Sequence, residues 1–303
     1  MKLFRIVALS PLILLAQLIL AQLLLAQQPP EASAPKARFH HVALNVTDPK
    51  DSIEFLTKRF DCEAAKLAGK EDAVWAQKSW ILFNKVAKQP PYEIVSTIWH
   101  IGWGAEDMKA TYQKQLDLGT KFQTPLTDIS KLANYNGFYY AYVDGPNHAL
   151  IELNTAQHHR FGHMHFLSDD PIAAGQWYAE YFGLRVRKGS GEKRYYEGFQ
   201  VGPASSFLVD NVNFIIYPAG YMEKQWPENW AKHKQFEPTK GRVIDHVGLS
   251  VDHLDETIAR LKNEGVNVIG KPAKFRKTGQ RAVMIEGPDH LSIQLVEGHA
   301  AKN

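Results

Sequence analysis

The sequence predicts an α+β protein built from four βαβββ units, and three observations lead to this fold class. First, one hairpin motif occurs twice, as GFYYAYVDGPNHALIELNT at residues 137–155 and as RAVMIEGPDHLSIQLVE at residues 281–297. Each copy has a hydrophobic run, a Gly-Pro-(Asn/Asp)-His turn and an alternating apolar strand. Second, the order of one strand, one helix and three strands recurs four times between residues 39 and 297. Third, the first strand of every unit carries a histidine at the same place.

The first two units follow this order closely. In the first, we expect a strand at 39–46, a helix from Pro49 to Phe60 after the acidic Asp48, and strands at 62–67, 73–77 and 80–86. In the second, we expect a strand at 98–104, a helix near 107–118, and strands near 121–124, 138–143 and 149–154.

The last two units repeat the order, with a longer insertion between them. In the third, a strand at 162–168 leads to a helix from Pro171 to Phe182 and strands near 184–187, 197–201 and 212–217. In the fourth, a strand at 244–251 leads to a helix near 254–264 and strands near 266–269, 282–286 and 291–296. Residues 218–242 are rich in Trp, Tyr and Lys, and we interpret them as a linker or lid.

The N-terminus has the pattern of a secretory signal peptide. Lys2 and Arg5 precede an apolar run from residue 6 to 25, and a small residue, Ala26, stands at a plausible cleavage point. We therefore expect a signal peptide at residues 1–26, a flexible leader at 27–38, export to the periplasm or the cell exterior, and no stable membrane association after cleavage. The alternative is an uncleaved N-terminal membrane anchor, because the run is nearly long enough to span a bilayer.

The composition limits the partners and the metal ligands that this chain can use. The formal net charge of the 303-residue chain is only +3 and no basic stripe occurs, so nucleic acid is not an expected partner. The only cysteine is Cys62, which excludes intramolecular disulfides and thiolate metal clusters. A metal site in this chain must use histidine and carboxylate ligands.

The repeated histidines can be aligned with one another. They are His41, His100, His163 and His246, and both His41 and His163 lie eight residues before the proline that opens the next helix. The matching positions on the fourth strands are Leu82, Glu152, Ile215 and Gln294. Glu152 is thus the only carboxylate in the set.

At these residues the sequence resembles the vicinal oxygen chelate superfamily of glyoxalases, bleomycin-resistance proteins and extradiol ring-cleavage dioxygenases. The strand His-Val-Ala-Leu-Asn-Val at 41–46 and the run that ends in Ile-Glu-Leu at 151–153 carry the resemblance, which covers residues 39–297. It implies βαβββ units paired into two curled mixed-sheet domains, with metal ligands on first and fourth strands. We expect a first domain at 39–157, a second at 158–297, and a tail at 298–303.

Carried over residue by residue, the resemblance implies one divalent metal ion held by His41, His100 and Glu152. Two imidazoles and one carboxylate are typical of Fe or Mn, and are compatible with Zn or Ni. Leu82 leaves the fourth ligand place empty, as in extradiol dioxygenases. If unit two pairs with unit three instead, as in some members of the family, His163 replaces His41. Further candidates are the possible second-shell residues Asn45, Asn154, Tyr140 and Tyr142, and a second cavity with His163, His165, His246 and Gln294.

Each candidate also has a purely structural interpretation. A histidine that begins a strand is more often a hydrogen-bonded structural residue than a ligand, and Tyr140 and Tyr142 fit core packing. The resemblance implies a metal-dependent enzyme that chelates a small oxygen-rich substrate, by dioxygenase-like or by glyoxalase-like lyase or isomerase chemistry, and it allows a homodimer. The N-terminal pattern makes this an exported enzyme. The alternative is a metal-free binding or sequestration protein of the bleomycin-resistance type.

Overall fold

The computed structural model describes residues 37–188, 191–231 and 235–299. The expected signal peptide, most of the leader and the end of the tail lie outside the described residues. Among the helices in this part of the chain, none has the length and apolar character needed to cross a bilayer.

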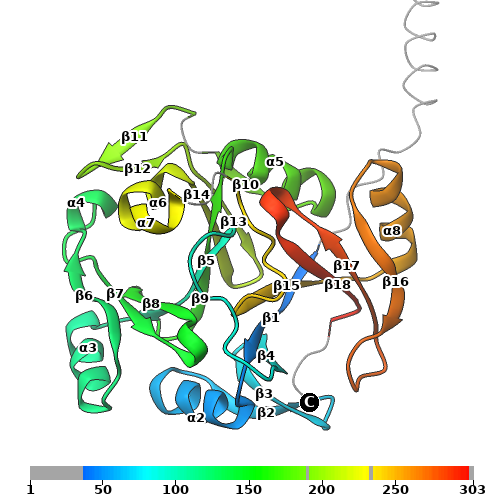
Figure 1. Ribbon diagram of the computed structural model, residues 1–303, viewed down its shortest axis with the longest axis horizontal. Coiled ribbons are helices and arrows are strands. Elements are labelled where there is room, and N and C mark those ends of the chain that lie inside the picture. Colours follow the sequence, from blue (N-terminus) through cyan, green and yellow to red (C-terminus); the bar gives the residue numbers. More distant parts are fainter. Residues whose placement is uncertain (1–36, 189–190, 232–234, 300–303) are drawn as a thin grey trace, which may run out of the picture. The chain divides into compact units, whose positions relative to one another are not determined.

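Four repeats of the strand–helix–strands order are present, which confirms the α+β fold class (Figure 1). Unit one contains β1 (Arg38–Val46), α2 (Pro49–Arg59), β2 (Glu63–Leu67), β3 (Glu71–Ala76) and β4 (Ser79–Lys85). Unit two contains β5 (Ile98–Ala105), α3 (Met108–Asp117), β6 (Phe122–Asp128), α4 (Ser130–Ala133), β7 (Tyr139–Asp144), the 3-10 turn η1 (Pro146–His148) and β8 (Leu150–Thr155).

Unit three is the most elaborate. It contains β9 (Phe161–Ser168), α5 (Pro171–Phe182), β10 (Val186–Lys188), β11 (Arg194–Tyr196), β12 (Phe199–Gly202), β13 (Ser205–Val209) and β14 (Val212–Pro218), and it is followed by α6 (Gly220–Gln225) and α7 (Pro227–Trp230). Unit four contains β15 (Ile244–Val251), α8 (Leu254–Asn263), β16 (Val268–Lys274), β17 (Arg281–Glu286), η2 (Pro288–His290) and β18 (Ser292–Glu297).

Aspartates begin three of the unit helices, which explains the recurrent acidic residue in the sequence. The Asp48 carboxylate accepts hydrogen bonds from the first backbone N–H groups of α2, and Asp107 and Asp170 do the same for α3 and α5. A proline at the first helical position, where no N–H is needed, follows Asp48 and Asp170.

One strand prediction in unit three was wrong. The segment predicted at 197–201 forms β12, which pairs with β11 in a separate two-stranded hairpin, and β13, which was not predicted, pairs with β14 in the main sheet. The turn between β13 and β14 contains Asp210 with a positive φ of 54°, a typical role for aspartate in a tight hairpin.

The units pair in an order that differs from the expected domains. The strands form two open eight-stranded mixed sheets: β16-β17-β18-β15-β1-β4-β3-β2 joins units four and one (sheet A), and β10-β13-β14-β9-β5-β8-β7-β6 joins units three and two (sheet C). In Figure 1, blue β1 accordingly lies beside β15 of the fourth unit, and β18 lies on the far side of β15. Residues 39–157 and 158–297 are therefore continuous in sequence but do not form separate domains in space.

The two sheets share one hydrophobic core, and each sheet also has a smaller apolar cluster of its own. Phe39 on β1 lies 6.0 Å from Phe161 on β9 and 5.7 Å from Phe214 on β14, measured between ring centroids. On sheet A a second apolar cluster includes Trp80, Leu82 and Phe275. On sheet C a third cluster joins strand residues to the insertion after β14, and this is the face that carries the site described next.

Candidate metal centre

Three adjacent strands at the middle of sheet C bring four potential ligands together: His100 on β5, Glu152 on β8, and His163 and His165 on β9. The register places His165 opposite His100 and His163 opposite Gly102 across the antiparallel β5–β9 pair, and Glu152 beside Gly102 across the parallel β5–β8 pair. Side chains at such neighbouring positions share one face of a sheet.

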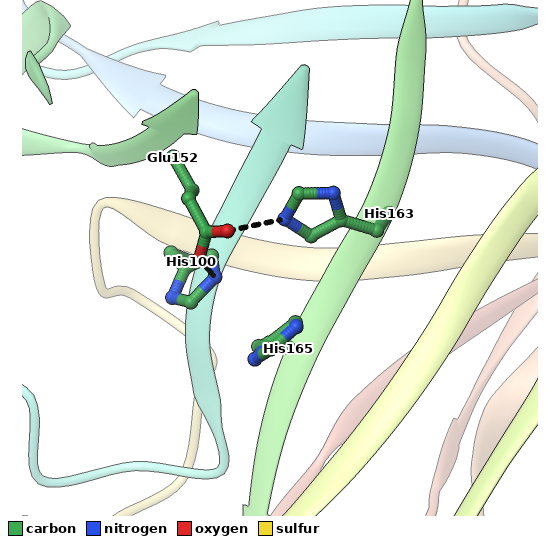
Figure 2. Close-up of side chains that lie close together, drawn as sticks. All are labelled: His100, Glu152, His163 and His165. Carbon is green, nitrogen blue, oxygen red and sulfur yellow. Dashed lines mark ion pairs between the residues drawn. The ribbon is translucent and has the colours of Figure 1, made fainter. Parts of the chain in front are cut away.

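One ligand atom from each of these residues lies within 4.8 Å of all the others (Figure 2). His100 Nε2 is 2.8 Å from Glu152 Oε2, and His163 Nε2 is 3.7 Å from Glu152 Oε1. The rings of His100 and His165 are stacked with centroids 4.5 Å apart. The carboxylate therefore faces a group of three imidazoles.

Burial keeps these imidazoles neutral. It lowers the pKa of His163 to about 4, although the nearby Glu152 opposes the shift, and it lowers the pKa of His100 and His165 well below the usual range. Neutral imidazole is the form that binds a metal ion.

Several buried nitrogens of the cluster have no hydrogen-bond partner. Nδ1 of His100 and Nδ1 of His165 have none, and Nε2 of His100 and of His163 face only the Glu152 carboxylate, without hydrogen-bond geometry. Unpaired buried polar atoms are costly, and a divalent cation at the centre of the four ligands would satisfy those nitrogens that face it. The residues present thus fit a single divalent metal ion.

The structure brings together only two of the three residues first expected to bind metal. His100 and Glu152 lie in the cluster, but His41 lies in sheet A, because β1 pairs with β15 and not with β5. The prediction that His41 completes the triple was wrong, whereas the alternative, with His163 in its place, agrees with the observed pairing.

His41 belongs instead to a second histidine group in sheet A. Its ring centroid is 5.3 Å from that of His246 and 5.5 Å from that of Phe275, and its Nδ1 lies 2.9 Å from Nδ1 of His40. His246 forms a hydrogen bond with Asp245. Gln294 pairs with Gly248 on this sheet, just as Glu152 pairs with Gly102 on sheet C.

The four residues predicted for a second cavity are therefore divided between the sheets. His163 and His165 belong to the cluster with Glu152, whereas His246 and Gln294 lie in sheet A with His41. Two positions after the aligned histidine, the other units have a small residue: Ala43, Gly102 or Gly248. Unit three has His165 there, and the sequence prediction did not use this difference. This difference was the sequence signal that His165 belongs to the site.

The residues predicted to surround the metal ligands also lie in different sheets. Asn154 donates a hydrogen bond to Glu152 Oε1 at 2.9 Å and so orients the carboxylate. Tyr142 lies 5.0 Å from His100 and 5.1 Å from Tyr140 between ring centroids. Asn45 lies in sheet A, where it donates to the Arg242 carbonyl and to Asp245, so its predicted place beside the metal ligands was wrong.

A cavity of about 420 Å³ opens in front of the cluster, and Glu152 and His165 line it directly. Its walls come from unit two and from the elaborated part of unit three, including the β11–β12 hairpin and α6. The insertion predicted as a linker or lid thus contributes Tyr221 and Gln225 to the wall. In size the cavity suits a small organic ligand.

Fold and site together define a protein of paired βαβββ units with a buried histidine–carboxylate cluster. The sequence model of the Glyoxalase/Bleomycin resistance protein/Dioxygenase superfamily matches residues 38–153 and again residues 160–295. The chain therefore belongs to this superfamily. A comparison with curated proteins gave no match.

Solved structures show the same fold at low sequence identity. Glyoxalase I from Zea mays is similar with a TM-score of 0.62 and 11% identity, over 86% of this chain and 92% of that chain. A putative dioxygenase from Bacillus subtilis subsp. subtilis str. 168 is similar with a TM-score of 0.56 and 10% identity, over 87% and 86% of the two chains. At these identities the similarity establishes the fold alone.

Proposed function

We propose that this chain is a metal-dependent enzyme that binds one divalent ion through His100, Glu152 and His163 and takes a small substrate that has two neighbouring oxygens. The observation that carries the proposal is the cluster itself: four potential ligand atoms within 4.8 Å, with buried imidazole nitrogens that have no hydrogen-bond partner. A metal ion held there would supply Lewis-acid chemistry to the substrate oxygens, and with Fe or Mn also redox chemistry.

The protein groups around this position have separate roles. Glu152 supplies the negative charge, and the amide of Asn154 fixes its orientation. His165 lines the cavity beside the cluster, so its imidazole is placed to contact the substrate. The aromatic walls exclude water and orient a flat ligand.

Extradiol-like ring cleavage is the favoured reaction. Ile215 stands beside His165 at the position where a fourth-strand ligand from unit three would lie, so only His100, His163 and Glu152 occupy repeat ligand positions. Two histidines and one carboxylate leave positions open for both a chelating substrate and dioxygen.

A glyoxalase-like lyase or isomerase is the second candidate, and His165 favours it. If His165 also binds the ion, four protein ligands leave room for the substrate oxygens but less for dioxygen. Zn or Ni would suit such a site. A metal-free binding protein of the bleomycin-resistance type is the rival outside enzymes.

Metal analysis of variants tests the ligand set, and sheet A supplies matched controls. We expect about one ion per chain in protein purified without chelators and without oxygen. His100→Ala, His163→Ala and Glu152→Ala should each abolish binding, whereas the positional counterparts His246→Ala, His41→Ala and Gln294→Ala should keep it. Stoichiometric metal in Glu152→Ala would refute the site.

His165→Ala separates the two reactions. Under the ring-cleavage proposal this variant keeps the metal ion and loses turnover, followed as oxygen consumption with a panel of catechols. Under the lyase or isomerase proposal it loses the metal ion as well. Wild-type protein that takes up no metal even after reconstitution would favour the binding protein.

We also propose that the chain is exported, on the evidence of the basic and apolar pattern at residues 1–26. N-terminal sequencing of the mature protein from a secreting host tests this. A start near residue 27 is expected, and an intact N-terminus in the membrane fraction would indicate an anchor instead.

A further inference from the structure

The cavity in front of the metal cluster has an aromatic interior and a charged rim. The interior side chains are Trp99, Phe138, Tyr140, Tyr142, Tyr217 and Tyr221. Tyr217 lies 5.3 Å from His165 and 6.2 Å from Trp99, and Tyr221 lies 4.7 Å from Trp99, all between ring centroids. Such walls suit a flat, unsaturated ligand that can stack on the rings.

The position of the metal cluster determines which end of the cavity holds the chelating oxygens of a substrate. Glu152 and His165 line the cavity where the metal cluster lies, so the chelating oxygens of a substrate must sit there. Both of these side chains are buried, so they form the inner end of the cavity. Arg194 lines the same cavity but is exposed, so it lies at the mouth, away from this buried end.

Among the described residues that line the cavity, Arg194 is the only arginine or lysine. It comes from β11, and among the described residues it forms no ion pair and no side-chain hydrogen bond. Two carboxylates, Asp128 and Glu197, also line the rim, and Asp128 accepts hydrogen bonds from the backbone N–H and the hydroxyl of Ser130. The guanidinium is therefore a positive charge at the rim that has no protein partner among the described residues.

We infer that the substrate is a small aromatic compound with vicinal oxygens at one edge and a carboxylate on a short side chain at the other, and that Arg194 binds the carboxylate. A guanidinium can donate two parallel hydrogen bonds to a carboxylate, which sets the orientation of the ring as well as its charge. This inference rests on the proposed function, since it takes the metal cluster as the chelating end.

Three catechols that differ only at the end of a two-carbon side chain test the inference: dihydrocaffeate with a carboxylate, ethylcatechol with no charge, and dopamine with an ammonium group. Binding to zinc-loaded protein is measured by calorimetry without oxygen, so no turnover is needed. We expect dihydrocaffeate to bind about tenfold more tightly than ethylcatechol, as one added charge-assisted contact would give.

Variants assign the effect to one residue. Arg194→Gln should remove the preference for dihydrocaffeate and leave the affinity for ethylcatechol unchanged, and Arg194→Lys should restore part of the preference. Arg187→Gln is the matched control, because Arg187 is also an exposed arginine of unit three but does not line the cavity.

The possible failures can be told apart. Equal affinities for the three catechols, or tighter binding of dopamine, would overturn the role of Arg194 while chelation at the metal stands. A preference that persists in Arg194→Gln would do the same. Loss of all catechol binding by the zinc-loaded protein would overturn the proposed function together with the inference.

Discussion

At the residue scale, glycines decide how closely the histidines approach the neighbouring strand. A Cβ atom on Gly102 would lie 2.0 Å from Nε2 of His163, and a Cβ atom on Gly248 would lie 2.0 Å from Nδ1 of His41. Both distances are far inside van der Waals contact. Each sheet thus has one histidine whose ring lies over a glycine on the antiparallel partner strand, and in sheet C that ring is a proposed metal ligand.

Gly102→Ala should therefore displace His163 and lower metal affinity by about 10- to 100-fold, the range found when the support of a ligand is lost. Gly248→Ala is the matched control, since it creates the same overlap with His41 and should cost about 1–3 kcal/mol of stability through overpacking without changing metal affinity. Competition with a chelator dye measures the affinity. Equal metal affinities for Gly102→Ala and wild type would contradict the geometry.

At the element scale, the two Gly-Pro-(Asn/Asp)-His turns connect one sheet to the other. Asn147 in η1 accepts a hydrogen bond from the Thr47 N–H at 3.0 Å and donates one to Gln89 Oε1 at 2.8 Å. Asp289 in η2 accepts one from the Asp169 N–H at 3.4 Å. Each turn thus meets the chain just after the first strand of a unit in the other sheet, which gives the repeated motif a structural role.

Asn147→Ala should destabilise the protein by about 2 kcal/mol, because it removes hydrogen bonds and places alanine at a φ of 51°, in the left-handed region. Asn147→Gly removes the same hydrogen bonds without the backbone cost and should lose only about half as much. Denaturant unfolding of the metal-free variants measures both. Identical losses would show that the backbone conformation contributes nothing.

At the scale of the whole molecule, buried neutral histidines link stability to pH. Burial, helped by repulsion from His299, lowers the pKa of His40 from 6.5 to about 3. In the unfolded chain the same imidazole binds a proton near pH 6.5, so the unfolded state binds more protons between these values. Stability is therefore fully present above pH 6.5 and is lost as the pH falls towards 3.

His40→Gln should remove this contribution and flatten the acid side of the stability profile by up to about 1.4 kcal/mol per pH unit, the value for one proton. Urea unfolding of metal-free protein between neutral pH and pH 5 measures the two slopes. If the variant and the wild type have equal slopes, His40 has the same protonation in the folded and the unfolded state, and the prediction is wrong.

Much of the fold and two of the three proposed ligands follow from local patterns. The repeated turn, the aspartate and proline at helix starts, and the aligned histidines predict four βαβββ units, and the family match confirms the superfamily. Glu152 stands out in the sequence as the only carboxylate at the fourth-strand positions. These features depend on residues near one another in the chain, where turn chemistry, capping and strand alternation act.

Only the tertiary structure decided which units share a sheet, and with it which histidine lies beside Glu152. All four first strands have nearly the same pattern, so strand pairing cannot be read from any one of them, and β5 beside β9 selects His163 over His41. The cavity wall could not be predicted from the sequence either. Arg194 and Tyr221 come from irregular additions to unit three, and the position of these additions depends on long-range packing. The sequence alone determined the four units, because the signals for turns, caps and strands are local. The ligand set depended on the tertiary structure, because strand pairing joins residues that are far apart in the chain.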